Sequence, residues 1–302
     1  MHGHAQQQGH GHGDGHSDEH EHGHDRSFAD MGEFLEREAG LHRQFVDDVA
    51  AWLGGLVSTP VTRVVDAGSG PGVGAVQLAR AFPDARVVAL DPERVLLDRA
   101  VELAAAAGVG DRFEVVEAAL PHGVDGLAAA DLVWSKLALH HVGDQQAAVA
   151  ALAGLVRRGG VVAVIEGGLP MRTLPRDIGV GRPGLEARLD GLAAEWFEHM
   201  RAQTPGSTTA VEDWGGMLRA AGLTPSGTKT FVADLPAPLA QADREVLFDR
   251  WRRTRERLGD KASAEDREAL DVLLDRDDPR GFPNREDVYF LHAMTVHTAR
   301  RD

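Results

Sequence analysis

A glycine-rich turn and a later carboxylate are the residues of this chain whose spacing points most clearly to chemistry. Asp66-Ala-Gly68-Ser-Gly70-Pro-Gly72 follows a short β-branched run at 61–65, and Asp91 closes the next apolar run. Such a run is typical of a buried parallel strand, and glycines after it permit a tight turn in which backbone N–H groups approach a ligand. In strand–turn–helix–strand units of this kind, the carboxylate ending the second strand accepts hydrogen bonds from ribose hydroxyls. We therefore expect a nucleoside-containing ligand.

The spacing of the glycines separates two kinds of nucleotide. Gly68, Gly70 and Gly72 alternate as G-x-G-x-G, whereas the dinucleotide pattern G-x-G-x-x-G would need glycine where this chain has Val73. Asp66 also places a carboxylate where a pyrophosphate would pass, and it suits a cationic methionine moiety better. Both observations argue against NAD as the nucleotide bound by this turn.

On these residues the chain resembles the class I S-adenosylmethionine-dependent methyltransferases. The segment from Asp66 to Gly72 is similar to their first motif, and Asp91 to their ribose-binding acid. The resemblance covers roughly residues 60–168 and implies S-adenosylmethionine as the cofactor. The cofactor-binding residues that it implies are Asp66, Gly68, Ser69, Gly70, Gly72, Asp91, Pro92, Ala118, Ala119 and Trp134.

Two further segments concern how the adenine of the cofactor is bound and which class of acceptor is methylated. Many family members have Gly-Asp after the third strand, where the acid holds the adenine amino group, but this chain has Glu117-Ala118-Ala119. Either Glu117 reaches the adenine or backbone groups alone bind it. After the fourth strand there is no Asn/Asp-Pro-Pro-Tyr, with which amino methyltransferases grip a flipped base. The stretch 139–142 instead resembles the Leu-His-His-Val segment of small-molecule methyltransferases.

The elements that must position these residues alternate between strands and helices. We expect strands at 61–65, 86–91, 112–116, 131–134 and 161–166, with helices at 75–82, at 92–108 and from Asp144 to about Gly160. Residues 228–233 and 288–298 look like the family's last antiparallel pair. The expected fold class is α/β, a seven-stranded, mostly parallel Rossmann-like sheet with helical additions at both ends, and the cofactor across the carboxyl ends of its strands.

The chain divides into four expected parts. Residues 1–26 form a disordered His-rich tail, and 27–58 form helices that either act as a lid or pack permanently on the domain. Residues 59–168 form the cofactor-binding core. Residues 169–302 hold a substrate-side insertion, the last strands and a helical segment at 240–274, which caps the site, makes a dimer contact or is a solvated appendage.

The substrate side offers a few candidate residues. If the acceptor needs a base, His141 is the first candidate and His140 the second, because both follow the fourth strand and imidazole titrates near neutral pH. The alternative is that one packs on the sheet edge and the other caps the next helix. Glu166 either orients a histidine or binds a backbone amide. Arg172, Arg176 and Arg182 lie in a loop expected at 167–184, where they clamp an anionic acceptor or are simply solvated.

The first 24 residues contain histidines and polar residues with almost nothing apolar to bury, so they should be disordered. Several histidines are spaced i, i+2, which suits zinc, nickel or copper, but incidental metal affinity would look the same. The candidate ligands are His2, His4, His10, His12, His16, His20, His22 and His24.

Composition narrows the classes of function. With 302 residues and 43% hydrophobic content the chain can bury a large core. Its net charge of −15 argues against nucleic acid as a partner. The absence of cysteine excludes thiol chemistry, and no apolar run reaches transmembrane length, so we expect a cytoplasmic enzyme.

We therefore expect a methyltransferase that moves a methyl group in line from S-adenosylmethionine to a small molecule, with homodimerisation open. One alternative is a fold relative that binds the same cofactor for other chemistry or as a sensor. A second is a metal-handling protein that works through the His-rich tail.

Overall fold

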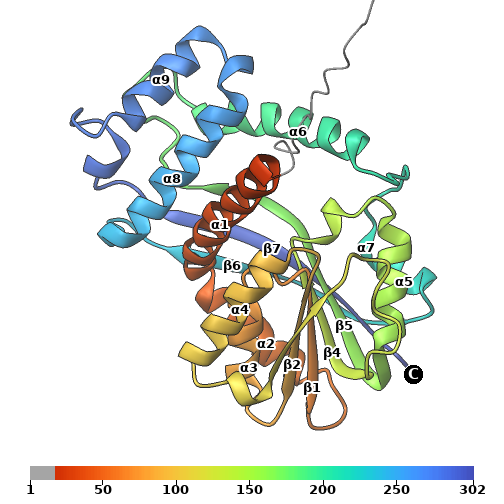
Figure 1. The fold of residues 1–302 in the computed structure, drawn as a ribbon. Helices are drawn as coiled ribbons and strands as arrows, with labels where there is room; N and C mark the ends of the chain where they lie inside the picture. Colours follow the sequence, from red (N-terminus) through yellow and green to blue (C-terminus); the bar gives the residue numbers. More distant parts are fainter. Residues whose placement is uncertain (1–17) are drawn as a thin grey trace, which may run out of the picture.

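A seven-stranded sheet forms the centre of the protein (Figure 1). The computed structural model describes residues 18–302, with side chains from Asp30 onward. The strand order is β3-β2-β1-β4-β5-β7-β6, and β7 alone among them runs against the rest. This is the expected α/β, mostly parallel sheet. Its strands are β1 (Arg63–Ala67), β2 (Arg86–Asp91), β3 (Phe113–Glu117), β4 (Ala130–Lys136), β5 (Val156–Arg172), β6 (Thr224–Leu235) and β7 (Phe290–Arg300).

Both faces of the sheet are buried, which explains the near-continuous apolar runs of its strands. Val64 and Leu132 belong to the hydrophobic cluster on one face, and their neighbours Val65 and Val133 to the cluster on the other. This alternation is the period of two that a strand imposes. The first face is covered by α2 (Arg43–Gly54), α3 (Val73–Ala81) and α4 (Arg94–Ala106), the second by α5 (Gln145–Leu155) and α7 (Trp214–Ala220).

The remaining helices are additions at one end of the sheet, where Figure 1 shows them gathered in the upper part of the view. They are α1 (Asp18–Leu41), α6 (Leu185–Gln203), α8 (Gln241–Leu258) and α9 (Ala264–Leu274). Helix α1 bridges the two parts, because Glu36 pairs with Arg99 of α4 at 2.8 Å while Glu38 pairs with Arg250 of α8. The predicted N-terminal helices therefore pack on both the sheet domain and the added helices.

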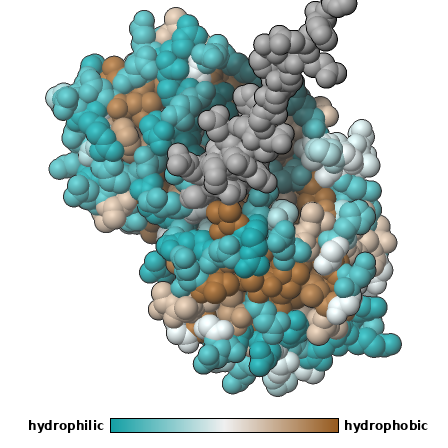
Figure 2. Space-filling model, in the orientation of Figure 1, coloured by the Kyte–Doolittle hydropathy of each residue, from teal (hydrophilic) through white to brown (hydrophobic). Residues whose placement is uncertain are grey.

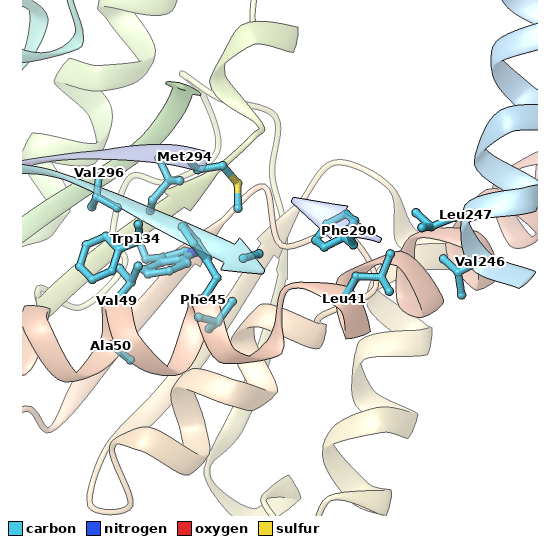
Figure 3. Packing of buried hydrophobic residues seen from close by; sticks show 14 of the residues in the cluster. Leu41, Phe45, Val49, Ala50, Trp134, Val246, Leu247, Phe290, Met294 and Val296 are labelled. Carbon is cyan, nitrogen blue, oxygen red and sulfur yellow. The ribbon is translucent and has the colours of Figure 1, made fainter. Parts of the chain in front are cut away.

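One hydrophobic core joins the sheet to the added helices. Figure 3 shows Phe45 of α2 beside Trp134 of β4, and Leu41 and Phe290 lying between this group and Leu247 of α8. Leu247 and Phe290 are completely buried. The segment expected at 240–274 is helical, as predicted, and its apolar side is packed rather than solvated.

The surface is mainly hydrophilic in the view of Figure 2, with apolar residues gathered in a band on the lower half of that face. Large apolar side chains that are exposed include Leu169, Val211 and Val232. None of the helices within residues 18–302 combines the length and the apolar character needed to cross a membrane.

The loop expected at 167–184 starts later than predicted, and the helix before the fifth strand ends earlier. Helix α5 stops at Leu155, and β5 continues to Arg172. The reason is pairing with β7: Gly168 lies opposite Met294, with shifts of register on either side. A Cβ atom at Gly168 would lie 2.1 Å from the Ala293 carbonyl oxygen, so this glycine permits close strand packing and is not a loop hinge.

The boundary of the predicted tail also needs correction. Helix α1 begins at Asp18, within the stretch 1–26 that the sequence assigns to a disordered tail. Once a packed helix exists, each further residue extends it at little cost, so polar residues can continue it outward. The expectation for residues 1–17 lies outside the described residues.

Candidate active site

The glycine turn lies at the carboxyl end of β1, as predicted. Gly68, Gly70 and Gly72 all have positive φ, and the amides of Gly68 and Ser69 donate to the Leu90 carbonyl at 2.7 and 3.0 Å, which ties the turn to β2. A Cβ atom would meet Ala138 at Gly68 and Ala100 at Gly72, but nothing within 4 Å at Gly70. The turn is thus fixed on two sides and open at Gly70, where a ligand can approach the backbone.

Asp91 is hydrogen-bonded to the open part of the turn, at Gly70. One carboxylate oxygen, Oδ2, accepts the Gly70 amide at 2.8 Å, and the other, Oδ1, accepts the Glu93 amide at 3.0 Å. Burial raises the pKa of Asp91, and these two amide hydrogen bonds work in the opposite direction. Each carboxylate oxygen accepts more than one hydrogen bond, so capacity for ribose hydroxyls remains.

Asp66 is buried beside the same turn, with 3% of its surface exposed. Its Oδ2 atom packs against Gly74 at the start of α3. Burial raises the pKa of Asp66 to about 7, opposed by the charge of Lys136 and assisted by that of Asp91. A cation bound near Asp66 would favour its ionised form.

A cavity of about 260 Å³ opens from the glycine turn. The sheet domain contributes Asp66, the turn residues Gly68 to Pro71, Trp134, Lys136 and Leu137. A second part of the lining comes from outside residues 59–168, the predicted cofactor-binding core. It consists of Leu35, Glu38 and Ala39 of α1, His42 just before α2, Met171 of β5, Arg250 of α8 and His292 of β7.

This second part of the lining contains two histidines in contact. Nε2 of His42 lies 3.0 Å from Nδ1 of His292. Burial lowers the pKa of His292 to about 4, assisted by the charges of Arg250 and Lys136, and burial likewise lowers that of His42. Burial also lowers the pKa of Lys136, although Glu38, Asp66 and Glu166 oppose this.

His140 and His141, the predicted candidates for a base, lie beside this cavity rather than in its lining. Nδ1 of His140 contacts Glu166 Oε2 at 2.8 Å, and its ring lies 4.1 Å from that of His141. Burial lowers the pKa of His141 to about 4, assisted by His140. Arg201 of α6 donates to the carbonyl groups of His140 and Val142. The structure therefore joins this segment to α6.

Glu166 fulfils both roles that the sequence offered. Its Oε1 atom accepts the amides of Ala138 and Leu139 at 2.9 and 2.8 Å, and Oε2 contacts His140. Leu137, which lines the cavity, has a φ of 52°, in the left-handed region that non-glycine residues rarely adopt. Glu166 thus fixes the strained turn that forms one border of the cavity.

The predicted arginine clamp lies elsewhere. Arg172 is paired with Asp190 of α6 at 2.6 Å, and Arg182 with Glu265 at 3.3 Å. Arg172 and Arg176 line a separate cavity of about 180 Å³. Strand β5 extends to Arg172, so this part of the chain is paired strand where the sequence suggested a loop starting at Gly167. The arginine that lines the cavity at the turn is Arg250.

Other predicted cofactor contacts flank Asp91. Pro92 is exposed and follows it directly, while the Ala118 amide donates to the Asp91 carbonyl at 3.1 Å. Ala119 and Glu117 are exposed, and Glu117 is paired in register with Asp91. These residues surround Asp91 at the carboxyl ends of β2 and β3. Trp134 lines the cavity.

Sequence reasoning missed five polar residues of the cavity. They are Glu38, His42, Lys136, Arg250 and His292. Lys136 had a usable signal, because it ends the fourth strand at the same edge as the turn. The other four come from helices and a strand distant in sequence, and no local pattern distinguishes them.

The predicted metal ligands are only partly within the described residues. His20, His22 and His24 lie on the backbone of α1, and His2 to His16 lie outside the described part of the chain. Among residues 18–302, no three histidine, aspartate or glutamate side chains gather as a metal site would require.

Comparison with known proteins identifies the central part of the chain. A family model described as a methyltransferase domain matches residues 64–160. An uncharacterized methyltransferase of Mycobacterium tuberculosis is 36% identical over 116 residues, which is 38% of this chain and 55% of the relative. The same figures hold for one from Mycobacterium bovis. The chain thus spans about half the length of the curated relatives it matches.

Solved structures with low sequence identity also match. An O-methyltransferase family protein from Burkholderia thailandensis has a TM-score of 0.49 at 18% identity and covers 88% of this chain and 58% of its own. A SAM-dependent methyltransferase from Thiobacillus denitrificans, in complex with S-adenosyl-L-homocysteine, has a TM-score of 0.44 at 18% identity, covering 82% and 89%. On the family match and the sequence relatives, residues 64–160 are a class I, S-adenosylmethionine-dependent methyltransferase domain.

Proposed function

We propose that the whole protein is an S-adenosylmethionine-dependent methyltransferase that modifies a small molecule held in the cavity beside the glycine turn. The observation that carries the proposal is the composition of this cavity. Its one wall is the turn and Asp66 of the methyltransferase domain, and its other wall is formed by polar residues of α1, α8 and β7. Cofactor and acceptor would therefore meet between the two walls.

The residues of the turn fit the cofactor. Gly70 leaves open space before the backbone, which an added Cβ atom would occupy. Asp91 keeps capacity for ribose hydroxyls, and Asp66 offers a carboxylate to the cationic methionine end. When bound, S-adenosylmethionine supplies an activated methyl group on a sulfonium ion.

What the chain itself contributes is mainly position and exclusion of water. Residues of α1 and α8 line part of the cavity, and Glu38 and Arg250 join the two helices. Holding an acceptor atom in line with the transferred methyl group supplies up to about 7–11 kcal/mol of the barrier reduction in well-oriented reactions. The packed helices serve that purpose.

The size of the cavity is in keeping with a small acceptor. A volume of about 260 Å³ lies just below the usual range of small-molecule sites, about 300–1,000 Å³. An anionic acceptor stays a prediction, and Arg250 is the residue that now supports it, since Arg172 is paired with Asp190. Homodimerisation also stays a prediction.

Calorimetry with the full chain tests the cofactor part of the proposal. S-adenosylmethionine and S-adenosylhomocysteine should bind at one site, and NAD should not. Asp91→Ala should weaken the affinity for both ligands by about tenfold or more, because hydrogen bonds to a charged group contribute roughly 1.5–3 kcal/mol each. Asp98→Ala, which removes an exposed carboxylate of α4, is the matched control.

Turnover distinguishes the enzyme from a sensor. Incubation with S-adenosylmethionine and mixed phenols, amines and carboxylic acids should release S-adenosylhomocysteine. Tight binding without release in any mixture would favour a sensor, and tight NAD binding would refute the cofactor assignment.

A further inference from the structure

His42 and His292 meet in the cavity although 250 positions separate them in the chain. Both lie outside residues 64–160, the part matched by the methyltransferase family model. His42 precedes α2 and packs edge-on against Phe45 and Phe290, with ring centroids at 6.4 and 5.1 Å. His292 is less buried and lines the cavity with it. The pair thus lines the same cavity as the glycine turn.

The partners of His42 determine where the protons of the pair lie. The backbone of Glu38 raises the pKa of His42, against the larger effect of burial, as an acceptor facing an imidazole N–H does. Because Nε2 of His42 faces His292, the nitrogen that can face Glu38 is Nδ1, and we infer that this is the protonated nitrogen. The neutral ring then has an unprotonated Nε2, which accepts from Nδ1–H of His292. Nε2 of His292 is left with a free lone pair.

The charged groups around the pair keep it neutral. Lys136 of β4 and Arg250 of α8 both lower the pKa of His292 and of His42, in addition to burial. Glu38 of α1 and Asp66 of β1 line the same cavity and balance these cations. With a pKa of about 4, His292 is unprotonated at neutral pH, which is the state that a base must have before it accepts a proton.

We propose that His292 is the general base of the methyl transfer, acting on a hydroxyl acceptor, with His42 as its positioning residue. This rests on the proposed methyltransferase function and names its acceptor class. Amines and carboxylates need little beyond positioning, whereas an unactivated phenol or alcohol must lose its proton as the new bond forms.

The step balances in atoms and charge. The acceptor oxygen forms a bond to the methyl carbon, the sulfur–carbon bond breaks, and its electron pair stays on sulfur. The hydroxyl proton moves to Nε2 of His292. The positive charge lost by the sulfonium is thus carried by the imidazolium, which His42 stabilises by accepting the hydrogen bond from Nδ1–H. The proton then leaves to solvent.

The first experiment compares two phenols with the full-length enzyme. At pH 8 phenol itself is protonated, whereas 4-nitrophenol is largely ionised and needs no base. His292→Ala should lower kcat/KM for phenol about a hundredfold or more, and that for 4-nitrophenol by less than about fivefold. Added imidazole should partly restore activity on phenol. His297→Gln, on the same strand but outside the cavity lining, is the control.

The second experiment needs no acceptor. Nitrogen-15 NMR is recorded on the imidazole rings of the wild type saturated with S-adenosylhomocysteine. It should show His292 protonated on Nδ1 and unprotonated on Nε2, which is the less common tautomer of free histidine. His42→Ala should let His292 revert to the common tautomer and should shift the pH profile of kcat/KM on phenol. A structural role for His42 would not move that profile.

The outcomes separate the two proposals. A proton on Nε2 of His292 in the wild type, or equal losses on both phenols in His292→Ala, overturns the assignment of the base. Methylation of amines or acids but of neither phenol overturns it too while leaving the methyltransferase function intact. Failure to bind S-adenosylmethionine overturns the proposed function, and the assignment of the base with it.

Discussion

Glu166 lies with its Oε2 atom 2.8 Å from Nδ1 of His140, and its other oxygen accepts two backbone amides of the preceding turn. Glu166→Ala removes both oxygens, so the amides of Ala138 and Leu139 lose their acceptor. Since an unsatisfied buried group costs about 1–3 kcal/mol, the free energy of unfolding should fall by at least that amount. Denaturant unfolding measures it, with Glu102→Ala as the exposed control. Equal midpoints for both variants would show that Glu166 does not fix the turn.

Asp66 should make stability and cofactor affinity depend on pH in opposite ways. Its pKa is about 7 in the folded protein and 3.8 as an ordinary carboxyl group, so the folded state binds more protons between these values. Stability therefore falls as pH rises from about 4 to 7, by up to a few kcal/mol. Asp66→Asn removes this pH-dependent loss of folding stability. Its melting temperature should exceed that of the wild type at pH 8 and approach it at pH 5.

Affinity for S-adenosylmethionine should follow the ionised form of Asp66. We expect wild-type affinity to rise as pH increases through about 7, and Asp66→Asn to bind more weakly with little pH dependence in this range. Asp84→Asn, an exposed carboxyl group between α3 and β2, serves as the control for both measurements. A wild type whose affinity is constant from pH 6 to pH 8 would contradict the role of Asp66.

Two glycines of the turn should respond differently to alanine. At Gly68 a Cβ atom would lie 2.2 Å from that of Ala138, so Gly68→Ala should destabilise the fold strongly. At Gly70 the added atom meets nothing, and the cost is the left-handed backbone alone, about 1–2 kcal/mol. Gly70→Ala should therefore remain folded by circular dichroism but bind cofactor poorly in calorimetry. Normal affinity in Gly70→Ala would place the cofactor elsewhere.

Deletion of residues 1–24 should leave the cavity intact. The ion pairs that anchor α1, from Glu36 to Arg99 and from Glu38 to Arg250, lie beyond the deleted part. We expect the thermal midpoint and cofactor affinity to be nearly unchanged, while most binding of nickel or zinc is lost. Loss of cofactor binding on truncation would show that the first residues belong to the site.

The sequence predicted the cofactor side of the cavity because its determinants are local. The strand 86–91 is observed with the bounds expected for it, and Asp66, Gly70 and Asp91 lie within one strand–turn–helix–strand unit. Burial on both faces imposes long β-branched runs there, and the turn demands glycine. Such constraints are visible in a single sequence.

The acceptor side of the cavity was not predictable, because its residues come from segments far apart in the sequence. His42 and His292 are ordinary residues in their own segments, and only the insertion of β7 between β5 and β6 brings them together. His140 and His141 carried the more obvious signal, since they follow a core strand, yet α6 and Glu166 hold them. The position of β5 was also misjudged, because its extension depends on pairing with a strand far along the chain.

The position of β7 between β5 and β6 sets an order on assembly of the protein during synthesis. Strands β5 and β6 cannot join each other until residues 290–300 have been made, because β7 lies between them. Until then both present unpaired backbone edges, which favour wrong pairing and slow the search for the native sheet. The glycine turn and Asp91, by contrast, lie in the first strands of the sheet to leave the ribosome. A ribosome stalled before residue 290 should thus carry a chain able to form the cofactor side, yet with His42 lacking its partner His292.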